Sequence, residues 1–405
     1  MDLHEEARVA KKIGLLLNAV PTAGGTFQYT LTMLDAVASL PRDEFTPLIA
    51  YFSDAWEPVI ENYGLKSIAI KTDSVTGTFG RALGKAWRML DLPVAAWRKI
   101  SPWIHPVARG ILAEKCDLWI FPTEESWTFE TPVPAIGVIH DLMHRYEGSF
   151  PEVSANGEYR RRELSYRKIC KWSKGLLVDS EIGKKQVIES YEMDPAKIFP
   201  LPFIAPPYLK KIGTPPDFAA RYRLPEKYFF YPSQLWEHKN HKGLIRAMNQ
   251  LTSRFPEMQL VFAGSKKNAY ESIQTLVTEL GLANRVHFLG YVPDEDMAEI
   301  YRRARAMIMP TFLGPTNIPP LEAFALGCPV ATSRVYGLPE QAGDAALLFN
   351  PNSTDEMADV MGRLWSDDAL CKDLAEKGLK RTERWGQPQF NTRLLEIIRA
   401  VVKKS

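Results

Sequence analysis

Cysteine is scarce in this sequence, and long apolar runs are missing from it. The cysteines are far apart and lack the C-x-x-C or Cys/His spacing of a zinc site, so neither a zinc site nor a disulfide framework is expected. They are Cys116, Cys170, Cys328 and Cys371. No run of about 18 apolar residues occurs, which predicts no membrane-spanning helix. The N-terminal MDLHEEARVAKK lacks an apolar core, so we also expect no cleaved signal.

An excess of charge of one sign is also missing. The 50 Lys and Arg residues nearly balance the 48 Asp and Glu residues, for a formal charge of +2. This balance offers no general attraction to nucleic acid, and we expect no nucleic-acid partner. The absence of disulfide spacing and of a signal makes the reducing cytoplasm the expected location.

The distribution of apolar residues indicates the fold class. Short runs rich in Ile, Val, Leu and Phe alternate with longer amphipathic stretches, which is typical of parallel sheets covered by helices. Ten strands are predicted, at residues 12–17, 46–52, 118–122, 135–140, 175–180, 228–233, 259–264, 286–290, 306–311 and 328–333. The predicted class is therefore α/β, with two Rossmann-like domains facing each other across a cleft.

The division into domains follows from length and proline content. The 405 residues exceed a single core, since cores stop growing near ~250–300 residues. Residues 200–218 carry six prolines among nineteen residues, which is typical of a linker. We predict an N-terminal domain over 1–200, a linker over 201–217 and a C-terminal domain over 218–385. A final helix over 386–405 is predicted to pack back on the first domain.

Ligands bind at the carboxyl ends of the strands in such sheets, so the loops there are the first candidates. After the first strand, Gly24 and Gly25 precede an amphipathic helix. Glycines at a helix start let backbone N–H groups approach a phosphate, although an ordinary tight turn explains the same residues. The spacing G-x-G-x-x-G is absent, so a dehydrogenase fits least.

Two further loops carry polar side chains after predicted strands. His140 and Asp141 lie at the carboxyl end of the strand predicted at 135–140. An imidazole there can bond a sugar hydroxyl or serve a structural role. A histidine–aspartate metal phosphohydrolase would need further metal ligands at helical spacing, which we do not find. Lys239, in YPSQLWEHKNHKGLIRAM, can place a point charge on a phosphate or lie solvated at the surface.

The loop after the strand at 306–311 reads GPTNIPPLEAFALG. Pro319 and Pro320 preset φ for a first helical turn, so a helix is predicted to begin there. Glu322 in that turn can accept from the two hydroxyls of a ribose, or it can simply complement the helix dipole. The N–H groups free to receive a diphosphate are those near Asn317, Ile318 and Leu321.

Together these loops resemble the retaining glycosyltransferases of the GT-B fold, specifically family 4 (glycosyltransferase group 1). The resemblance covers most of the chain and is most specific in the second domain. It is carried there by YPSQLWEHKN, LVFAGSKK, RVHFLGYVPDEDMAEIYRRARAMIMPT and PPLEAFALGCPVATSRVYGLPEQAGDAALLFNP.

The resemblance implies a role for each candidate residue. Glu322 would bind the donor ribose, and the backbone from Asn317 to Leu321 would receive the diphosphate. Lys239 would pair with that diphosphate, while His140 would touch the transferred sugar. The remaining donor-binding candidates are Gly24, Gly25, Gln234, Tyr291, Val292, Thr316 and Ile318. The catalytic candidates are His140, Lys239 and Asn317.

Two residues depart from the family's pattern. Gly314 stands where the family usually has a glutamate that meets the donor sugar, and Gln234 stands where it usually has a phosphate-binding arginine. The loss of one electrostatic donor to a developing charge typically costs about 2.7–4 kcal/mol of transition-state stabilisation. Thr316 and Asn317 lie in the same loop as Gly314 and can hydrogen-bond a sugar or phosphate.

The implied reaction is retaining transfer of a hexose or deoxyhexose from a nucleotide diphosphate sugar, with GDP-mannose favoured. The acceptor would be a saccharide or a polyprenyl-diphosphate-linked saccharide in bacterial surface polysaccharide assembly. The nucleotide sugar is a substrate, so no cofactor and no metal are expected. The acidic run at Asp294–Asp296 is interpreted as a helix cap. A nucleotide-sugar-binding pseudoenzyme and an epimerase of the same fold remain alternatives.

Residues 81–110 combine tryptophans with basic side chains. Trp87, Trp97 and Trp103 lie among six Lys and Arg residues, which suits an anionic membrane surface or a lipid diphosphate acceptor. Ordinary packing of the tryptophans with solvated charges explains the pattern equally well. The membrane interpretation predicts that the protein lies peripherally, on the inner face of the membrane.

Overall fold

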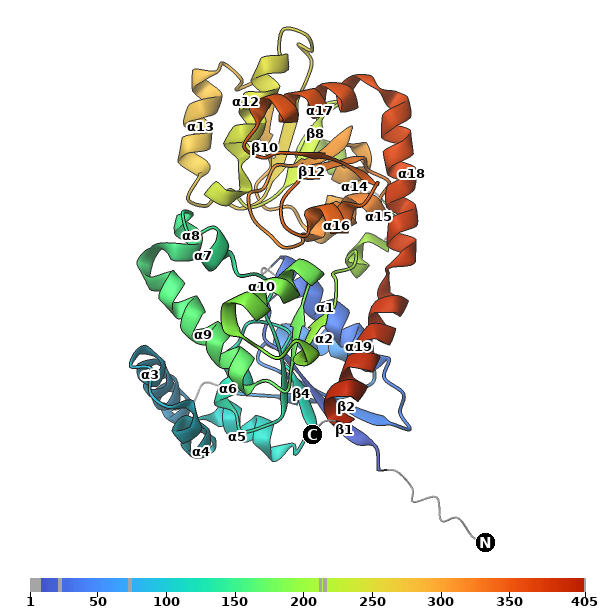
Figure 1. The fold of residues 1–405 in the computed structure, drawn as a ribbon. Coiled ribbons are helices and arrows are strands. Elements are labelled where there is room, and N and C mark those ends of the chain that lie inside the picture. Colours follow the sequence, from blue (N-terminus) through green and yellow to red (C-terminus); the bar gives the residue numbers. More distant parts are fainter. Residues whose placement is uncertain (1–8, 21–23, 72–74, 211–212, 214–216, 404–405) are drawn as a thin grey trace. The chain divides into compact units, whose positions relative to one another are not determined.

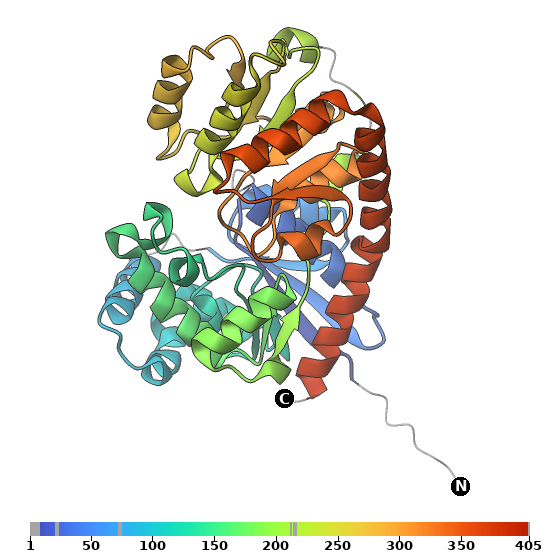
Figure 2. The ribbon, with the colours of Figure 1, turned by 45° about the horizontal axis from the view of Figure 1, so that its top comes forward.

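The computed structural model describes residues 9–20, 24–71, 75–210, 213 and 217–403 (Figures 1 and 2). They form two compact units. The first comprises the described residues of 1–142, 160–202 and 387–405, and the second those of 143–159 and 203–386. Part of the predicted linker, at residues 211–212 and 214–216, lies outside the described residues.

The first unit is built on a parallel sheet of seven strands in the order β3-β2-β1-β4-β5-β6-β7. The strands are β1 Lys11–Leu17, β2 Phe45–Tyr51, β3 Lys66–Ala69, β4 Leu118–Ile120, β5 Ala135–Val138, β6 Gly175–Val178 and β7 Ile198–Pro200. The helices are α1 Gly25–Ala38, α2 Glu57–Glu61, α3 Val75–Met89, α4 Val94–Ile104, α5 Pro106–Ala113, α6 Trp127–Glu130, α9 Glu158–Trp172, α10 Glu181–Tyr191 and α19 Gln387–Lys403, with 3-10 turns η2 Asp54–Trp56 and η4 Pro195–Lys197.

The last helix, α19, belongs to this first unit. Its Phe390 ring meets the edge of Tyr29 on α1 at a centroid distance of 6.4 Å. Gln387 donates to the carbonyl of Thr32 at 3.2 Å. Because α19 packs on α1, the end of the described chain covers the first unit.

The second unit is built on a parallel sheet of six strands in the order β10-β9-β8-β11-β12-β13. The strands are β8 Phe229–Pro232, β9 Leu260–Ala263, β10 Val286–Phe288, β11 Ala306–Met309, β12 Val330–Ser333 and β13 Ala346–Phe349. The helices are α7 Met143–Tyr146, α8 Pro151–Ser154, α11 Phe218–Tyr222, α12 His241–Leu251, α13 Tyr270–Glu279, α14 Asp294–Arg303, α15 Ile318–Ala325, α16 Leu338–Ala342, α17 Thr354–Ser366 and α18 Asp368–Arg384, with 3-10 turns η3 Ala155–Gly157, η5 Pro207–Lys210 and η6 Glu237–Lys239. In this unit α12 packs against α13 and α17, and α15 packs against α18 (Figure 1).

The predicted α/β class and the ten predicted strands are confirmed. Each predicted strand overlaps an observed one, and the ends differ by at most two residues. Three strands were not predicted, namely β3, β7 and β13, and each lies at an edge of its sheet. Interior strands such as β5 and β9 are buried at every position, whereas β3 is largely exposed, so its sequence lacks the apolar run.

The strand order reverses once in each sheet, between β1 and β4 in the first and between β8 and β11 in the second. In open α/β sheets, ligands bind outside the carboxyl ends of the strands at such a reversal. In the second unit, the loop that follows β8 contains Lys239 and the loop that follows β11 contains Gly314–Asn317. The topology therefore places the two most informative predicted loops beside each other.

Residues 143–159 pack with the second unit, although the sequence suggested a single division near residue 200. Met143 and Val153 share an apolar cluster with Leu313, against which Phe150 and Phe312 also pack. The rings of Phe150 and Phe312 stack at 5.5 Å. This segment therefore contributes side chains next to the loop that follows β11.

All four cysteines are buried free thiols, which agrees with the predicted lack of a disulfide framework. Among the residues that the structure describes, none of the helices is long and apolar enough to cross a bilayer.

Candidate functional site

The loop after β8 holds Lys239 in a short 3-10 turn that Asn240 ends. Asn240 has a left-handed φ of 56°, and its side-chain oxygen accepts from the N–H of Gly243 at 3.2 Å. Its amide nitrogen donates to the carbonyls of Pro310 at 3.1 Å and of Pro351 at 2.9 Å. One buried side chain thus caps α12 and joins the loops that follow β8, β11 and β13.

Lys239 and His241 flank Asn240 in the chain, and of these two only Lys239 is charged. Burial, together with the nearby Lys239 and His238, lowers the pKa of His241 to about 3. His241 is therefore neutral at physiological pH. A diphosphate that approached the loop would meet the Lys239 ammonium as a point charge.

The loop after β11 ends where α15 begins, at Ile318, so the helix start predicted near Pro319 is confirmed. Asn317 is its N-cap residue and makes no side-chain cap hydrogen bond. Instead, Gln341 on α16 accepts from the Asn317 N–H at 3.0 Å and donates to the Asn317 carbonyl at 2.7 Å. Arg381 in turn donates to the backbone carbonyl of Gln341. The two hydrogen bonds between Gln341 and Asn317 fix the orientation of the peptide groups at the start of α15.

The two loops meet through side chains. Lys239 Nζ donates to Asn317 Oδ1 at 3.4 Å, a long hydrogen bond. The lysine therefore stands at the N-terminus of α15, where the helix dipole favours an anion. The prediction that the Asn317 N–H is free for a diphosphate is wrong, because it donates to Gln341. A cation and a helix start directed at one place form an arrangement suited to a diphosphate.

The backbone at Gly314 explains why no glutamate stands there. Its φ of 117° lies in the region that side chains rarely adopt. A Cβ on Gly314 would lie 2.3 Å from Nδ2 of Asn317, well inside contact distance. The Asn317 amide thus occupies the space that a side chain on residue 314 would need.

Glu322 lies one turn into α15 and is 9% exposed. Tyr208 donates to its Oε1 at 2.8 Å, and Tyr301 donates to its Oε2 at 2.6 Å. Burial raises the pKa of Glu322, and the hydrogen bonds from the two tyrosines oppose that effect. The carboxylate is therefore held in a fixed orientation at the start of the helix.

Glu152, from the segment 143–159, braces the lysine loop. Its carboxylate accepts from the backbone N–H of His238 at 2.9 Å and contacts the His238 ring. It also accepts from the amide of Asn268 at 2.9 Å, in the loop that follows β9. Burial acts to raise the pKa of Glu152, but these hydrogen bonds outweigh it and lower the pKa to about 2.

The other predicted residues of the second unit also lie in strand-end loops. Gln234 is exposed, and its side-chain oxygen accepts from the indole of Trp236 at 2.9 Å. After β10, Tyr291 is 66% exposed while Val292 is buried. Thr316 is half-buried beside Asn317.

The predicted residues of the first unit also lie at strand ends. Gly24 has a φ of 59° and is the N-cap of α1, which begins at Gly25. The rings of His140 and Tyr29, on α1, meet edge-on at 4.9 Å, and the backbone N–H of His140 donates to the Glu124 carboxylate at 3.0 Å. The start of α1 and the end of β5 are thus held together within this unit.

The acidic run at Asp294–Asp296 lies in the first turn of α14, but the N-cap is Pro293 and no side chain caps the helix. The prediction that this run caps the helix is therefore wrong. Asp296 instead is fully buried and accepts from Arg221 and from Tyr222, at 2.6 Å for the tyrosine. In the described part of the chain, no three His, Cys, Asp or Glu side chains are grouped as a metal site requires.

Residues 81–110 fall on α3, α4 and α5 of the first unit, where α3 and α4 lie side by side (Figures 1 and 2). Trp97 is buried and packs against Trp87 at 5.4 Å, so ordinary packing accounts for this pair. Trp103 is 80% exposed. Arg88 pairs with the buried Glu130.

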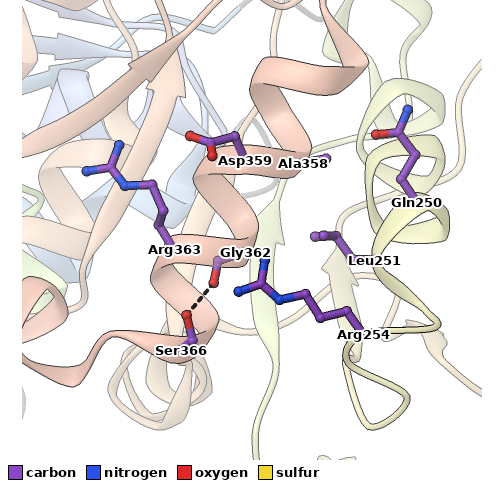
Figure 3. Close-up of a pocket in the computed structure, with 8 residues that line it drawn as sticks. All are labelled: Gln250, Leu251, Arg254, Ala358, Asp359, Gly362, Arg363 and Ser366. Carbon is purple, nitrogen blue, oxygen red and sulfur yellow. Dashed lines mark hydrogen bonds between the residues drawn. The ribbon is translucent and has the colours of Figure 1, made fainter.

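A small depression of about 200 Å³ lies between α12 and α17 of the second unit (Figure 3). Gln250, Arg254, Asp359 and Arg363 are among its lining residues. It contains none of the predicted site residues and lies between helices rather than at strand ends. We therefore do not assign the candidate site to it.

Three contributors to the site were missed by sequence reasoning. Tyr208, Tyr301 and Gln341 each act through a partner that lies 21 to 114 residues away in the chain. No local motif marks such pairs. Asn240 carried a signal that could have been used, because an asparagine three residues before a glycine at a helix start is a typical cap.

Residues 217–381 match the family described as glycosyl transferases group 1. This match lies within the second unit, and the two α/β units have the fold of GT-B glycosyltransferases. The resemblance to group 1 glycosyltransferases with the GT-B fold is thereby confirmed.

Relatives are found at modest identity. The O-antigen chain mannosyltransferase B of Escherichia coli is 26% identical over 341 residues, which cover 80% of this chain and 84% of that protein. The D-inositol 3-phosphate glycosyltransferase of Corynebacterium jeikeium is 32% identical over 148 residues, 35% of each chain. Anabaena HepE, solved with UDP and glucose, has a TM-score of 0.72 at 16% identity and covers 96% of this chain and 99% of its own. At that identity the likeness shows the fold alone.

The geometry at Gly314 predicts the cost of restoring a side chain there. Gly314→Ala should lower the free energy of unfolding by about 1–3 kcal/mol, because it strains the backbone and collides with Asn317. Gly281→Ala is the matched control, since Gly281 has a φ of 67° but open space around its Cα. Chemical denaturation of both variants measures the difference. An equal or smaller loss for Gly314→Ala would contradict the proposed clash.

Proposed function

We propose that this protein is a retaining glycosyltransferase that uses a nucleotide diphosphate sugar. It transfers a hexose or deoxyhexose, with GDP-mannose the favoured donor, to a saccharide or lipid-linked saccharide in bacterial surface polysaccharide assembly. The observation that carries the proposal is the meeting of Lys239 with Asn317 at the start of α15, with Glu322 one turn further on.

In the proposed mechanism, the start of α15 and Lys239 act on the leaving diphosphate. Negative charge grows on that group as the anomeric carbon becomes oxocarbenium-like, and preorganised donors stabilise it most at that point. Glu322 orients the ribose, and His140 is assigned to a hydroxyl of the transferred sugar. This arrangement needs no divalent metal, because the lysine and the helix dipole supply the positive potential.

The donor sugar is proposed to meet the Asn317 amide in place of the family's usual carboxylate. Asn317 is held by Gln341 through its backbone and by Lys239 through its side chain. An amide offers both a donor and an acceptor to sugar hydroxyls, whereas a carboxylate only accepts. The preference for mannose rests on the relatives described as mannosyltransferases.

A screen of GDP-, UDP- and dTDP-sugars tests the donor class. A bound ligand raises the thermal stability, by about 2.7 kcal/mol at a hundredfold excess over Kd. We expect one class to stabilise the protein and Glu322→Gln to weaken its binding about 10–100-fold, as expected for a lost bond to a charged group. Glu257→Gln, an exposed carboxylate of the same unit, is the control. His140→Ala should mainly lower turnover.

Three outcomes of this screen would count against the proposal. If none of the sugar nucleotides stabilises the protein, the assignment of the donor site is wrong. Binding without transfer to any acceptor would favour a pseudoenzyme, and interconversion of donors without an acceptor would favour an epimerase. The configuration of the new glycosidic bond, read by NMR, decides whether transfer is retaining.

We also propose that α3 and α4 contact an anionic membrane surface. Supporting this are four exposed apolar side chains, namely Trp103 at 80%, Leu90 at 70%, Met89 at 65% and Phe79 at 60% exposure. Lys85 and Lys99 on the same helices are exposed as well. Apolar side chains beside lysines suit the boundary between lipid headgroups and acyl chains.

Flotation with phosphatidylglycerol vesicles tests this contact. The wild type should float with the vesicles, and Leu90→Ser/Trp103→Ser should lose most of the binding because it removes the two largest exposed apolar contributions. Leu379→Ser, which changes an exposed leucine of the second unit, is the matched control. No flotation of the wild type, or equal flotation of the double variant, would remove the membrane proposal.

A further inference from the structure

The buried carboxylate of Glu322 is hydrogen-bonded at both of its oxygens. Each of its oxygens accepts from a different tyrosine hydroxyl, Oε1 from Tyr208 and Oε2 from Tyr301. A buried carboxylate is unfavourable unless hydrogen bonds compensate for lost hydration. The two phenols supply that compensation in the structure.

The two tyrosines are anchored differently. Tyr301 is fully buried on α14, and its ring meets the edge of the Phe230 ring at 4.9 Å. Its hydroxyl also lies 3.3 Å from the carbonyl of Pro319, at the start of α15. Tyr301 is therefore a fixed part of the core behind Glu322.

Tyr208 reaches Glu322 from outside this core. It lies on the 3-10 turn η5, which packs against α14, and its side chain is only half-buried. This turn follows the proline-rich stretch from residue 200, far from Glu322 in sequence. Of the two hydroxyls, the one from Tyr208 thus comes from a turn outside the sheet, whereas the one from Tyr301 belongs to the core.

A ribose presents two neighbouring hydroxyls, each of which can donate to a carboxylate as a tyrosine does. A carboxylate oxygen can accept more than one hydrogen bond, but Glu322 is only 9% exposed and the Tyr208 hydroxyl lies 2.8 Å from its Oε1. A ribose that bonds both oxygens therefore meets Tyr208 at Oε1. We propose that the Tyr208 hydroxyl takes the place of a ribose hydroxyl on Glu322, and that a nucleotide displaces it when its ribose binds. This inference rests on the proposed function, which supplies the ribose-bearing ligand.

Tyr208 is then a specificity-determining residue for the donor. It weakens the binding of ribonucleotides, because each binding event exchanges one hydrogen bond for another instead of adding one. It has no such effect on a nucleotide without ribose hydroxyls, which cannot replace the tyrosine on Glu322.

Calorimetric titration of the full chain with GDP and 2′,3′-dideoxy-GDP tests this, and the UDP pair is titrated in the same way. Relative to wild type, Tyr208→Phe should bind the ribonucleotide roughly fivefold more tightly, the value of one net hydrogen bond, and the dideoxynucleotide equally well. The dissociation constant of the dideoxynucleotide divided by that of the ribonucleotide should therefore rise roughly fivefold. Tyr208→Leu, which also lacks the hydroxyl, should shift the ratio in the same direction.

Tyr222→Phe is the matched control, because Tyr222 also donates to a buried carboxylate, that of Asp296 on α14. It should leave the ratio unchanged. If Tyr208→Phe also leaves the ratio unchanged, or binds the ribonucleotide more weakly, the inference is overturned while the proposed donor site stands. If wild type binds neither GDP nor UDP, the proposed function fails and the inference fails with it.

Discussion

The hydrogen bonds of one buried asparagine hold the candidate site together. Asn240 caps α12 and donates to Pro310 and Pro351, so the loops that follow β8, β11 and β13 share one side chain. Each bond contributes about 0.5–1.5 kcal/mol net, and a buried group left without its partner costs about 1–3 kcal/mol. Gly243 permits the cap, since a Cβ there would lie 2.4 Å from the asparagine oxygen. Through this residue Lys239 is placed opposite the start of α15.

The same packing accounts for the unusual residue at position 314. The resemblance implies a glutamate there, but the backbone φ of Gly314 disfavours any side chain, and the Asn317 amide lies where its Cβ would be. Asn317 is itself held at three atoms, by Lys239 through its side-chain oxygen and by Gln341 through its backbone N–H and carbonyl. The absence of a side chain at residue 314 and the placement of the Asn317 amide are therefore linked.

Much of this could be predicted from the sequence, because interior parallel strands are continuous apolar runs and their carboxyl ends meet at one edge. That reasoning placed Lys239 and Asn317 in strand-end loops, put Glu322 in the helix that follows, and found the start of α15. It missed the exposed edge strand β3, and it missed side chains that reach the site from distant segments. Glu152 lies 86 residues from His238, and Tyr208 lies 114 residues from Glu322. Such pairs depend on packing between segments, which local patterns do not encode.

The central claim is that the start of α15, beside Lys239, receives a nucleotide diphosphate. Hydrogen–deuterium exchange of the peptides that contain Ile318 and Leu321 tests it most directly, with GDP and UDP compared with guanosine and uridine. The account predicts that a diphosphate slows exchange there, that the nucleoside alone does not, and that Lys239→Ala reduces the protection. Binding of the diphosphate with unchanged exchange at these residues would contradict it.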